Sequence, residues 1–244
     1  MSEAKGALVT GAGSGIGRAC ALALDAMGYR VALVGRDLER LRATADACRD
    51  AVPLTADVRR REQVDAAIGE AVAQLGRLDV AVVNAGTFPP RLRIDETTDE
   101  AWRETLAINL DGAFHTIAAA LPHLRATSGY VFGVGSVYGE GGMRLGAPYA
   151  ASKSGMAALV YSVLQEWEEH GVRATLIDPG IVRTPMASGH PDEAALLEPE
   201  DVARAVRFCL ELSPAAIVRQ IAVERTVVAR NDREVQENAR RWHG

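Results

Sequence analysis

Short apolar runs rich in β-branched residues alternate along the chain with longer segments in which apolar residues recur at helical spacing. The short runs predict seven strands, at residues 6–10, 30–35, 51–55, 79–83, 129–134, 172–178 and 219–224. The longer segments predict six helices, at residues 15–28, 38–49, 60–76, 98–126, 147–170 and 200–212. This alternation is typical of βα units wound into a parallel sheet.

The predicted strands are apolar along their whole length, as in Val80-Ala81-Val82-Val83. A strand with one face in water would alternate polar and apolar residues, so we expect helices on both faces of the sheet. No repeat, low-complexity tract or linker interrupts the series, which predicts a single domain over residues 1–244. The expected fold class is therefore α/β, doubly wound, with a seven-stranded parallel sheet.

Two local features qualify this pattern. Pro122 lies near the last turn of the predicted helix at 98–126 and is expected to kink or end it. The only long irregular segment that the pattern predicts is 184–198, which is rich in Pro, Gly and Ala and follows a strand. A segment of this kind beside a strand end is expected to form a mobile flap.

Charge and cysteine content narrow the class of protein. The formal net charge of -5 comes from interspersed acidic and basic residues, which argues against nucleic acid or an anionic membrane as a partner. Cys20, Cys48 and Cys209 lie far apart, which supports neither a disulfide framework nor a zinc site, and no histidine lies in a metal-binding pattern. The first predicted strand begins too early for a signal peptide to precede it. No apolar run approaches the length of about eighteen residues that a membrane-spanning helix needs. We expect a cytoplasmic protein without a metal.

A glycine-rich turn follows the first strand, with Gly11, Gly15 and Gly17 in the spacing Gly-x-x-x-Gly-x-Gly and Ser14 and Ile16 between them. Glycines let the backbone approach a pyrophosphate closely, and free N–H groups at the start of the next helix attract the anion. A glycine-rich turn is by itself often only a tight connection. Its position between an N-terminal strand and a helix favours a dinucleotide site and a fold of the Rossmann type.

The second strand ends in Gly35-Arg36-Asp37, where such a fold meets the adenosine ribose. An acidic residue at this position would bind the 2′-hydroxyl, whereas Arg36 favours a 2′-phosphate and therefore NADP. Two observations keep NAD open. Ser14 supplies no second cation, and Arg36 could instead pair with Asp37 or Glu39.

Tyr149 and Lys153 are four residues apart on a predicted helix and so lie on one face of it. A free tyrosine titrates near pH 10, and the ammonium of Lys153, together with the positive ring of an oxidised nicotinamide, is expected to lower the pKa of Tyr149. Ser136 ends the predicted fifth strand, at the edge where an α/β sheet presents ligands. Its hydroxyl could hold a carbonyl or alcohol oxygen while the phenol exchanges a proton.

With these motifs in place, the sequence resembles the short-chain dehydrogenase/reductase family, in its single-domain branch of about this length. The resemblance extends from Lys5 to about residue 212. The matching motifs, in the family's order, are residues 10–17, Asp57-Val58, Asn84-Ala85-Gly86, Asn109, Ser136, Tyr149 with Lys153, and Pro179-Gly180 with Thr184. The family's first Asn in the Asn-Asn-Ala-Gly turn is Val83 here.

The resemblance implies a role for several further residues. Asp57 and Val58 would meet the adenine, and Asn84, Ala85 and Gly86 would form the turn beside the adenosine. Lys153 would bind the nicotinamide ribose, and Asn109 would hold a water that links Lys153 to solvent. Pro179, Gly180, Ile181 and Thr184 would border the nicotinamide, with Ile181 and Thr184 on its carboxamide. The other interpretations are that Asn84 ties neighbouring strands together and that Asn109 is an ordinary amide on a helix surface.

A substrate pocket is expected between the segment after Ser136 and the flap after Thr184. The apolar candidates for its lining are Val137, Tyr138, Met143, Leu145 and Met186. The candidates to receive a carboxylate are Arg144, Arg183 and His190. Solvated arginines and packing methionines are the alternative interpretation of both sets.

The predicted function is hydride transfer between NAD(P) and a secondary alcohol or carbonyl of a small substrate, with Tyr149 as acid/base. The alternatives are a dinucleotide sensor of the same fold without turnover, or an enzyme acting on a 3-oxoacyl thioester, a steroid or a sugar alcohol. The C-terminal residues 221–226 resemble the branch that contains dehydrogenases of small hydroxy acids. The family resemblance also implies a homo-oligomer, a dimer or tetramer, assembled through the helices at 98–126 and 147–170.

Overall fold

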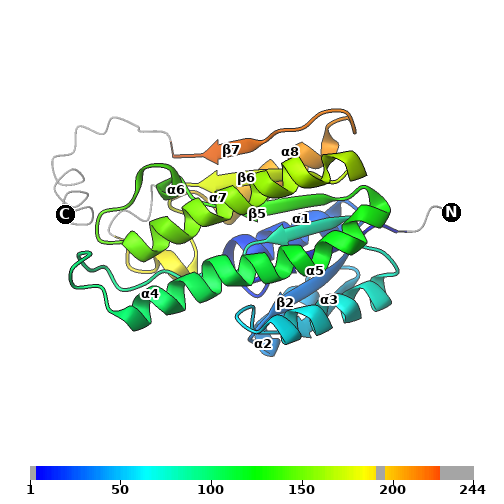
Figure 1. Cartoon of the computed structure of the whole chain (residues 1–244). Helices are drawn as coiled ribbons and strands as arrows, with labels where there is room; N and C mark the ends of the chain where they lie inside the picture. The colour runs from blue at the N-terminus through cyan, green and yellow to red at the C-terminus, as the bar shows by residue number, and fades with distance from the viewer. Residues whose placement is uncertain (1–3, 191–195, 226–244) are drawn as a thin grey trace.

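The computed structural model describes residues 4–190 and 196–225 and contains one seven-stranded sheet, in which every pair of neighbouring strands is parallel (Figure 1). The strand order is β3-β2-β1-β4-β5-β6-β7. The strands are β1 (Gly6–Thr10), β2 (Arg30–Gly35), β3 (Ala51–Thr55), β4 (Val80–Val83), β5 (Tyr130–Val134), β6 (Arg173–Pro179) and β7 (Gln220–Val223). The predicted doubly wound α/β fold is confirmed, and the strand bounds differ from the predicted ones by at most one residue.

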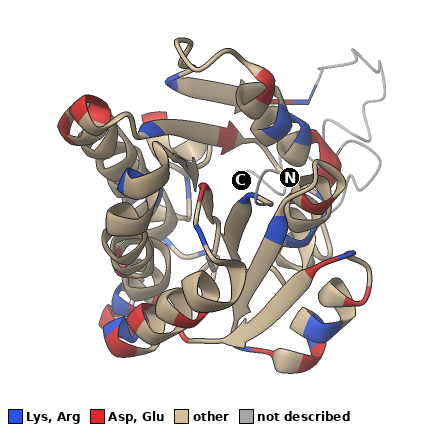
Figure 2. Ribbon diagram, turned by 90° about the vertical axis from the view of Figure 1, so that its right-hand side faces the viewer, with Lys and Arg blue, Asp and Glu red and all other residues tan. Residues whose placement is uncertain are grey.

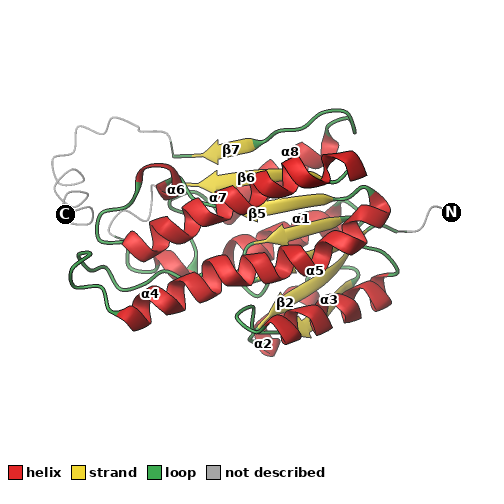
Figure 3. Ribbon diagram, in the orientation of Figure 1, coloured by secondary structure: helices red, strands yellow, loops and turns green. Residues whose placement is uncertain are grey.

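Helices cover both faces of the sheet (Figures 1 and 3). They are α1 (Gly15–Ala26), α2 (Leu38–Ala45), α3 (Arg61–Leu75), α4 (Asp99–Leu106), α5 (Gly112–Thr127), α6 (Tyr138–Gly141), α7 (Ala147–Trp167) and α8 (Pro199–Glu211). Helices α3, α5 and α7 pack on one face, while α1 and α8 pack against each other on the opposite face. Within the described residues no helix is both long enough and apolar enough to cross a membrane.

Each face of the sheet has its own apolar core, because successive side chains of a strand point to opposite faces. In β1, Leu8 belongs to the core under α3, α5 and α7, whereas Ala7 and Val9 belong to the core under α1 and α8. All five residues of β1 and all five of β5 are buried. This explains why the strands read as continuous apolar runs.

The helix predicted at 98–126 is divided, and the division does not occur at Pro122. Residues Ala107–Asp111 form a π-helical turn between α4 and α5, in which Gly112 N–H donates to Ala107 O. Pro122 lies inside α5, which continues to Thr127, so the helix does not end at this proline. A π turn inserts an extra residue into the helix, and this insertion leaves no periodic trace in the sequence.

A second long irregular segment was not predicted. Residues 84–98 join β4 to α4 without regular structure, and they include the pair Pro89-Pro90. These two prolines disfavour both helix and sheet, and they are the feature of the sequence from which this irregular segment could have been predicted. Residues 191–195 of the flap predicted at 184–198 lie outside the described residues, whereas Pro185–Ala187 form a short 3₁₀ helix.

Local sequence sets the ends of several helices. Asp37 accepts from Arg40 N at 3.1 Å to cap α2, and Thr98 accepts from Ala101 N at 3.2 Å to cap α4. Gly76 ends α3 with a φ of 83°, a conformation that glycine adopts without strain. In Figure 2, Lys and Arg and Asp and Glu are scattered over the helices, as expected from the interspersed charges. One such pair is Arg61–Asp65 in α3, at 2.8 Å.

The order of the strands determines where a ligand can bind. The chain moves from β1 outward to β2 and β3, and then returns to place β4 on the other side of β1. Ligands of open α/β sheets bind at the carboxyl ends of the strands where the order reverses, here those of β1 and β4. The sheet ends at β3, an edge strand that contains Pro53 opposite Leu33 of β2.

Candidate active site

A cavity of about 740 Å³ lies at the carboxyl ends of β1, β4, β5 and β6. Its lining comes from the segments that follow these four strands, together with residues at the end of β2 and in α2 and α7. The predicted site residues in the lining are Gly11, Ser14, Gly15, Ile16, Arg36, Asn84, Ala85, Gly86, Ser136, Tyr149, Lys153, Pro179, Gly180, Ile181 and Thr184. Gly17, Asp57, Val58 and Asn109 are not in the lining.

The glycine-rich turn meets the cavity with its backbone. Gly11 and Gly15 have φ values of 67° and 51°, and Ser14 precedes the first turn of α1 in an extended conformation. A Cβ added to Gly15 would lie 2.8 Å from Cγ2 of Thr184. Gly17 faces the protein instead, where a Cβ would collide with Gly11 O. The first two glycines therefore leave the start of α1 open to a ligand, and the third allows close packing.

Asn84 ties β4 to β1. Its Nδ2 donates to Thr10 O at 2.9 Å, and its backbone N–H donates to Thr10 Oγ1 at 3.0 Å. Thr10 Oγ1 also accepts from Ala85 N at 3.1 Å. The interpretation of Asn84 as a tie between strands thus describes its hydrogen bonds, and the same ties hold residues 84–86 against the cavity.

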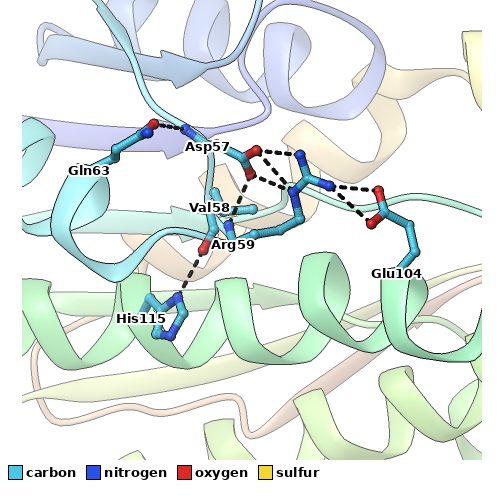
Figure 4. A network of polar contacts seen from close by, with 6 residues as sticks. All are labelled: Asp57, Val58, Arg59, Gln63, Glu104 and His115. Atoms are coloured by element: carbon cyan, nitrogen blue, oxygen red, sulfur yellow. Dashed lines mark hydrogen bonds and ion pairs between the residues drawn. The ribbon is translucent and has the colours of Figure 1, made fainter. Parts of the chain in front are cut away.

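Asp57 and Val58 belong to a polar network beside the cavity (Figure 4). Both carboxylate oxygens of Asp57 accept from Arg59, whose guanidinium also donates to Glu104 at 2.9 Å. The Arg59 guanidinium lowers the pKa of Asp57. Val58 O lies 2.9 Å from Nδ1 of His115. These contacts fix the segment after β3 to α4 and α5.

Tyr149, Ser136 and Lys153 converge at the far side of the cavity from the glycine-rich turn. The phenol of Tyr149 is hydrogen-bonded to Ser136, and its ring centroid lies 4.9 Å from that of Phe88. Ser136 Oγ accepts from Tyr138 N at 3.3 Å, at the start of α6. Lys153 Nζ donates to Val134 O at 2.8 Å and lies 5.6 Å from the centre of the Tyr149 ring.

Burial dominates the protonation of this group. It raises the pKa of Tyr149 to about 12, although the hydrogen bond with Ser136 acts in the opposite direction. It lowers the pKa of Lys153 to about 8, and the charge of Asp178 opposes this change. The expected lowering of the Tyr149 pKa requires an oxidised nicotinamide beside Lys153, so it stays a prediction; in the protein alone, burial of the phenol is the largest effect.

Asn109 lies in the π turn and is fully buried. Its Oδ1 accepts from Thr87 N at 2.7 Å, and its Nδ2 donates to Thr87 O at 3.0 Å and to Ser152 Oγ at 3.0 Å. The interpretation as a surface amide is wrong. The side chain instead anchors the segment after β4 to the helix that carries Tyr149 and Lys153.

Two arginines line the cavity at the end of β2. Besides the predicted Arg36, Arg40 in the first turn of α2 faces the cavity, and it supplies the second cation that Ser14 does not. The two acids that could have paired with Arg36 have other partners. Asp37 pairs with Arg40 at 3.2 Å, and Glu39 pairs with Arg42 at 2.9 Å.

The substrate side of the cavity differs in part from the prediction. Tyr138, Met143 and Met186 line it, as expected, but Val137, Arg183 and His190 do not. Arg144 and Leu145 line a neighbouring hollow of about 530 Å³, and Arg183 pairs with Glu198 at 2.9 Å. Arg91, which follows Phe88, Pro89 and Pro90, also lines the cavity on this side. This difference arises because residues 84–98 were not recognised as a loop that turns toward the site.

The lining fits a dinucleotide. One side of the cavity holds the N-terminus of α1 and glycines at which an added Cβ would meet neighbouring atoms. A pyrophosphate needs close backbone N–H groups of this kind. Cations lie at the end of β2, where the adenosine ribose is expected. Proton-exchanging side chains lie on the opposite side, beyond the switch point between β1 and β4.

Comparison with known proteins agrees with this geometry. The family model described as "short chain dehydrogenase" matches residues 5–195. L-fucose dehydrogenase of Oryctolagus cuniculus is 37% identical over 179 residues, 73% of this chain and 63% of the relative, so the chain spans less than two thirds of that protein. An oxidoreductase of Staphylococcus aureus (strain MW2) is 34% identical over 221 residues, 89% of this chain and 95% of the relative.

Two solved structures have the same fold at moderate identity. An alcohol dehydrogenase of the archaeon Thermococcus sibiricus, complexed with 5-hydroxy-NADP, is 31% identical with a TM-score of 0.85, and the match covers 93% of this chain and 99% of that one. Levodione reductase is 28% identical with a TM-score of 0.85, and the match covers 90% and 95% of the two chains. The chain therefore belongs to the short-chain dehydrogenase family of NAD(P)-dependent oxidoreductases, as its motifs predicted.

Proposed function

We propose that this protein catalyses reversible hydride transfer between NADP or NAD and the carbinol or carbonyl carbon of a small substrate, with Tyr149 as the acid/base. The observation that carries the proposal is the convergence of Tyr149, Ser136 and Lys153 in one cavity with the glycine-rich turn. A nicotinamide ring supplies or accepts the hydride when it is bound. The protein's residues then have to hold the substrate oxygen and move its proton.

In this proposal Ser136 orients the substrate oxygen, because its hydroxyl is already hydrogen-bonded to the phenol that exchanges the proton. Tyr149 donates that proton during reduction and removes it during oxidation. With a pKa of about 12 in the protein alone, Tyr149 is poised as an acid. Ionisation for the oxidative direction requires positive charge beyond that of the protein alone, which an oxidised nicotinamide bound beside Lys153 would supply.

Asn109 has an indirect place in the proposal. The family resemblance implies that it holds a water, yet its side-chain amide is engaged by Thr87 and Ser152. We assign it the role of fixing the loop after β4 against α7, which keeps Lys153 in place beneath the cofactor site. Asp57 and Val58 support the adenine end in a similar way, through their contacts with Arg59 and His115.

NADP is the proposed cofactor. Arg36 and Arg40 both face the cavity where the adenosine ribose is expected, and two guanidinium groups suit a phosphate better than a hydroxyl. Asp37, which could have accepted from a ribose hydroxyl, caps α2. The alcohol dehydrogenase of Thermococcus sibiricus, which was solved with an NADP derivative, supports this choice.

The proposed substrate is a small secondary alcohol, polyol or hydroxy acid, or the corresponding carbonyl compound. Phe88, Tyr138, Met143 and Met186 give the cavity an apolar part, and Arg91 adds one cation that suits a polar or carboxylate group. The L-fucose dehydrogenase among the relatives extends the candidates to sugars. Thr184, Pro185, Met186 and Ala187, at the start of the segment predicted as a flap, line this side of the cavity.

We also propose a cytoplasmic homo-oligomer, either a dimer or a tetramer. Cys20, Cys48 and Cys209 are free thiols, which suits a reducing compartment. Trp102 of α4 and Phe114 of α5 are 40% and 49% exposed, so the helices at 98–126 carry apolar side chains that an interface could cover. Light scattering coupled to size-exclusion chromatography measures the mass of the assembly, and a monomer would contradict this part of the proposal.

A substrate panel tests the proposed function. The panel consists of secondary alcohols, polyols, L-fucose, small hydroxy acids and their carbonyl counterparts, each offered with NADP(H) and with NAD(H). The expected result is a change in absorbance of the reduced nicotinamide with at least one member, and faster turnover with NADP(H). Tight binding of the cofactor with no turnover across the panel would contradict the proposal and favour a dinucleotide sensor.

A further inference from the structure

A carboxylate that the family motifs do not include is enclosed beside the reacting group. Asp178 is the last residue but one of β6, and only 3% of it is exposed. Its Oδ1 accepts from the backbone N–H of Ser136 at 2.8 Å. Its Oδ2 accepts from Nε2 of Gln220, in β7, at 2.8 Å. Both hydrogen bonds are donated to the carboxylate, which favours its ionised form despite a pKa raised by burial.

Gly135 makes the space that Asp178 occupies. A Cβ added to Gly135 would collide with Oδ1 of Asp178 and would lie 3.2 Å from its Cγ and 2.9 Å from Cδ1 of Leu176. No φ constraint accounts for this glycine, since its backbone lies outside the left-handed region. The missing side chain at position 135 and the carboxylate at position 178 are therefore a complementary pair.

Asp178 and Lys153 reach the same short stretch of main chain. Lys153 donates to Val134 O, Asp178 fills the space over Gly135, and Asp178 accepts from Ser136 N. The two charges thus meet three consecutive residues at the end of β5. The charge of Asp178 raises the pKa of Lys153, in opposition to the larger effect of burial, and it also raises the pKa of Tyr149.

Side chains from three other elements surround this carboxylate. Gln220, which lies opposite Leu176 in the ladder between β6 and β7, donates to Asp178 and to Glu140 of α6. Tyr161 of α7 donates to Oε1 of Gln220 at 2.9 Å. Among the described residues, four titratable groups interact with Asp178 through its charge. They are Glu140 of α6 and Tyr149, Lys153 and Tyr161 of α7.

We propose that Asp178 is a positioning residue for the reaction, which holds Ser136 through its main-chain N–H and places a negative charge on the same stretch of main chain that Lys153 Nζ contacts. Gly135 provides the space for this carboxylate, and Gln220 fixes its second oxygen. The inference rests on the proposed function only for the roles of Ser136 and Lys153. The placement of the charge can be tested without turnover, so a failure of either idea can be told from a failure of the other.

The chain offers a clean measurement, because Lys5 and Lys153 are its only two lysines. Protein labelled with ¹³C at the lysine ε carbon gives two titrating signals, and a Lys5→Arg variant assigns them. The pKa of Lys153 is expected near the value of about 8 that burial produces. In Asp178→Asn it should fall by about one unit, because removal of an anion makes loss of the proton easier. Lys5, which precedes the amino end of the inner strand β1 and so lies away from the cavity at the carboxyl ends, supplies the reference signal.

Glu140→Gln is the matched control. It removes a carboxylate that is bonded to the same Gln220, but from an exposed residue whose charge has no resolved effect on Lys153. The Lys153 signal should titrate in Glu140→Gln as it does in the native protein. An equal titration of Lys153 in the native protein and in Asp178→Asn would overturn the proposal, as would an equal shift in both variants.

A second pair of substitutions covers the case in which Asp178→Asn does not fold. Gly135→Ala should lower the melting temperature sharply, because its methyl group collides with the Asp178 carboxylate. In Asp178→Ala the carboxylate is absent, so adding Gly135→Ala to that variant should lower the melting temperature little further. The Gly135→Ala/Asp178→Ala protein should also show the lowered pKa of Lys153. Additive losses of melting temperature in this double-mutant cycle, or a native-like Lys153 titration in the double variant, would refute the assignment.

If the panel yields a substrate, turnover gives a third readout. Asp178→Asn should lower kcat more than it raises KM, since Ser136 and Lys153 act on the reacting atoms, and the apparent pKa values in the profile of kcat against pH should move to lower pH. A loss confined to thermal stability, with an unmoved pH profile, would reduce Asp178 to a packing residue and contradict the proposal.

Discussion

The two sides of the cavity are built in opposite ways. On the phosphate-loop side, formed by Gly11, Ser14, Gly15 and Ile16, the surface offered to a ligand is main chain, and it exists because side chains are missing. On the reaction side, formed by Ser136, Tyr149 and Lys153, the surface consists of side chains whose protonation is set by burial and by neighbouring charges. The first side should therefore fail when atoms are added, and the second when a proton or a charge is removed.

The sharpest test of this contrast is Tyr149→Phe. Turnover should fall by about 10³-fold, because the proton has no other donor in the proposed mechanism, while the dissociation constant of NADPH should stay within about twofold. Stopped-flow or steady-state rates give the first quantity, and fluorescence titration gives the second. Tyr29→Phe is the control, since Tyr29 belongs to the core beneath α1 and α8 and does not line the cavity. Near-native rates in Tyr149→Phe would show that the phenol is not the proton donor on the reaction side.

The converse test adds one methyl group to the other side. Gly15→Ala should weaken NADPH binding by between about 10- and 30-fold, because Gly15 has a left-handed φ of 51° and the added Cβ would lie 2.8 Å from Thr184. Once the cofactor is saturating, kcat should change little. Gly69→Ala in the middle of α3 is the matched control, because nothing lies within 4 Å of its added Cβ. It should leave binding unchanged and stabilise the fold by about 0.5 to 1 kcal/mol. An unaltered affinity in Gly15→Ala would contradict the idea that open backbone binds the pyrophosphate.

Charge at the ribose end separates the two cofactors. Arg36→Asp should lower the ratio of kcat/KM for NADPH to that for NADH by about tenfold or more, because it replaces a cation for the 2′-phosphate with an anion. Arg40→Ala should act in the same direction and more weakly. Arg42→Ala, which only breaks the exposed pair with Glu39, should leave the ratio unchanged. A constant ratio in Arg36→Asp would leave NADP without support from this part of the cavity.

The smallest effect is a pH dependence of stability on the reaction side. Lys153 has a folded pKa of about 8, below its unfolded value, so between pH 8 and 10 the unfolded state binds more protons and the native fold gains stability as the pH rises. Tyr149, whose folded pKa is raised to about 12, acts only above about pH 10 and with the opposite sign. From pH 8 to 10 the native protein should gain about 1 to 2 kcal/mol relative to Lys153→Met, measured by urea denaturation. The stability of Lys5→Met should change with pH as that of the native protein does. If the stability of Lys153→Met also changed in parallel with that of the native protein, the burial of the Lys153 ammonium could not be the source of the pH dependence.

The sequence predicted the parts of this molecule that depend on local order. Continuous apolar runs located the inner strands because both of their faces are buried, and the apolar residues of the edge strands β3 and β7, which are only partly buried, located these two as well. The spacing of Tyr149 and Lys153 placed both side chains in the cavity. Arg40 was missed because nothing in the adjacent sequence marks it as a site residue. It reaches the cavity together with Arg36 because α2 begins at Leu38 and carries Arg40 in its first turn. Phe88 and Arg91 were missed because they lie on a loop whose path depends on the Asn109 anchor in the π turn.

Asp178 shows a different kind of limit. Its neighbours in sequence, Ile177 and Pro179, mark it only as part of a buried strand. Its meaning depends on the register between β5 and β6, which pairs Val134 with Ile177 and so brings Ser136 N to its carboxylate. Register of this kind is a property of the assembled sheet and leaves no spacing that can be read along one segment.

The margin of the sheet formed by β3 has a consequence for the behaviour of the protein at high concentration. An exposed edge strand invites strands of other molecules to pair with it, and such pairing seeds aggregation. Pro53 lies in the middle of this five-residue strand and has no N–H to offer an incoming chain. A bacterial-expression or crystallisation effort that mutated Pro53 to a β-branched residue would remove this protection, and loss of solubility would then follow without any change in the cavity.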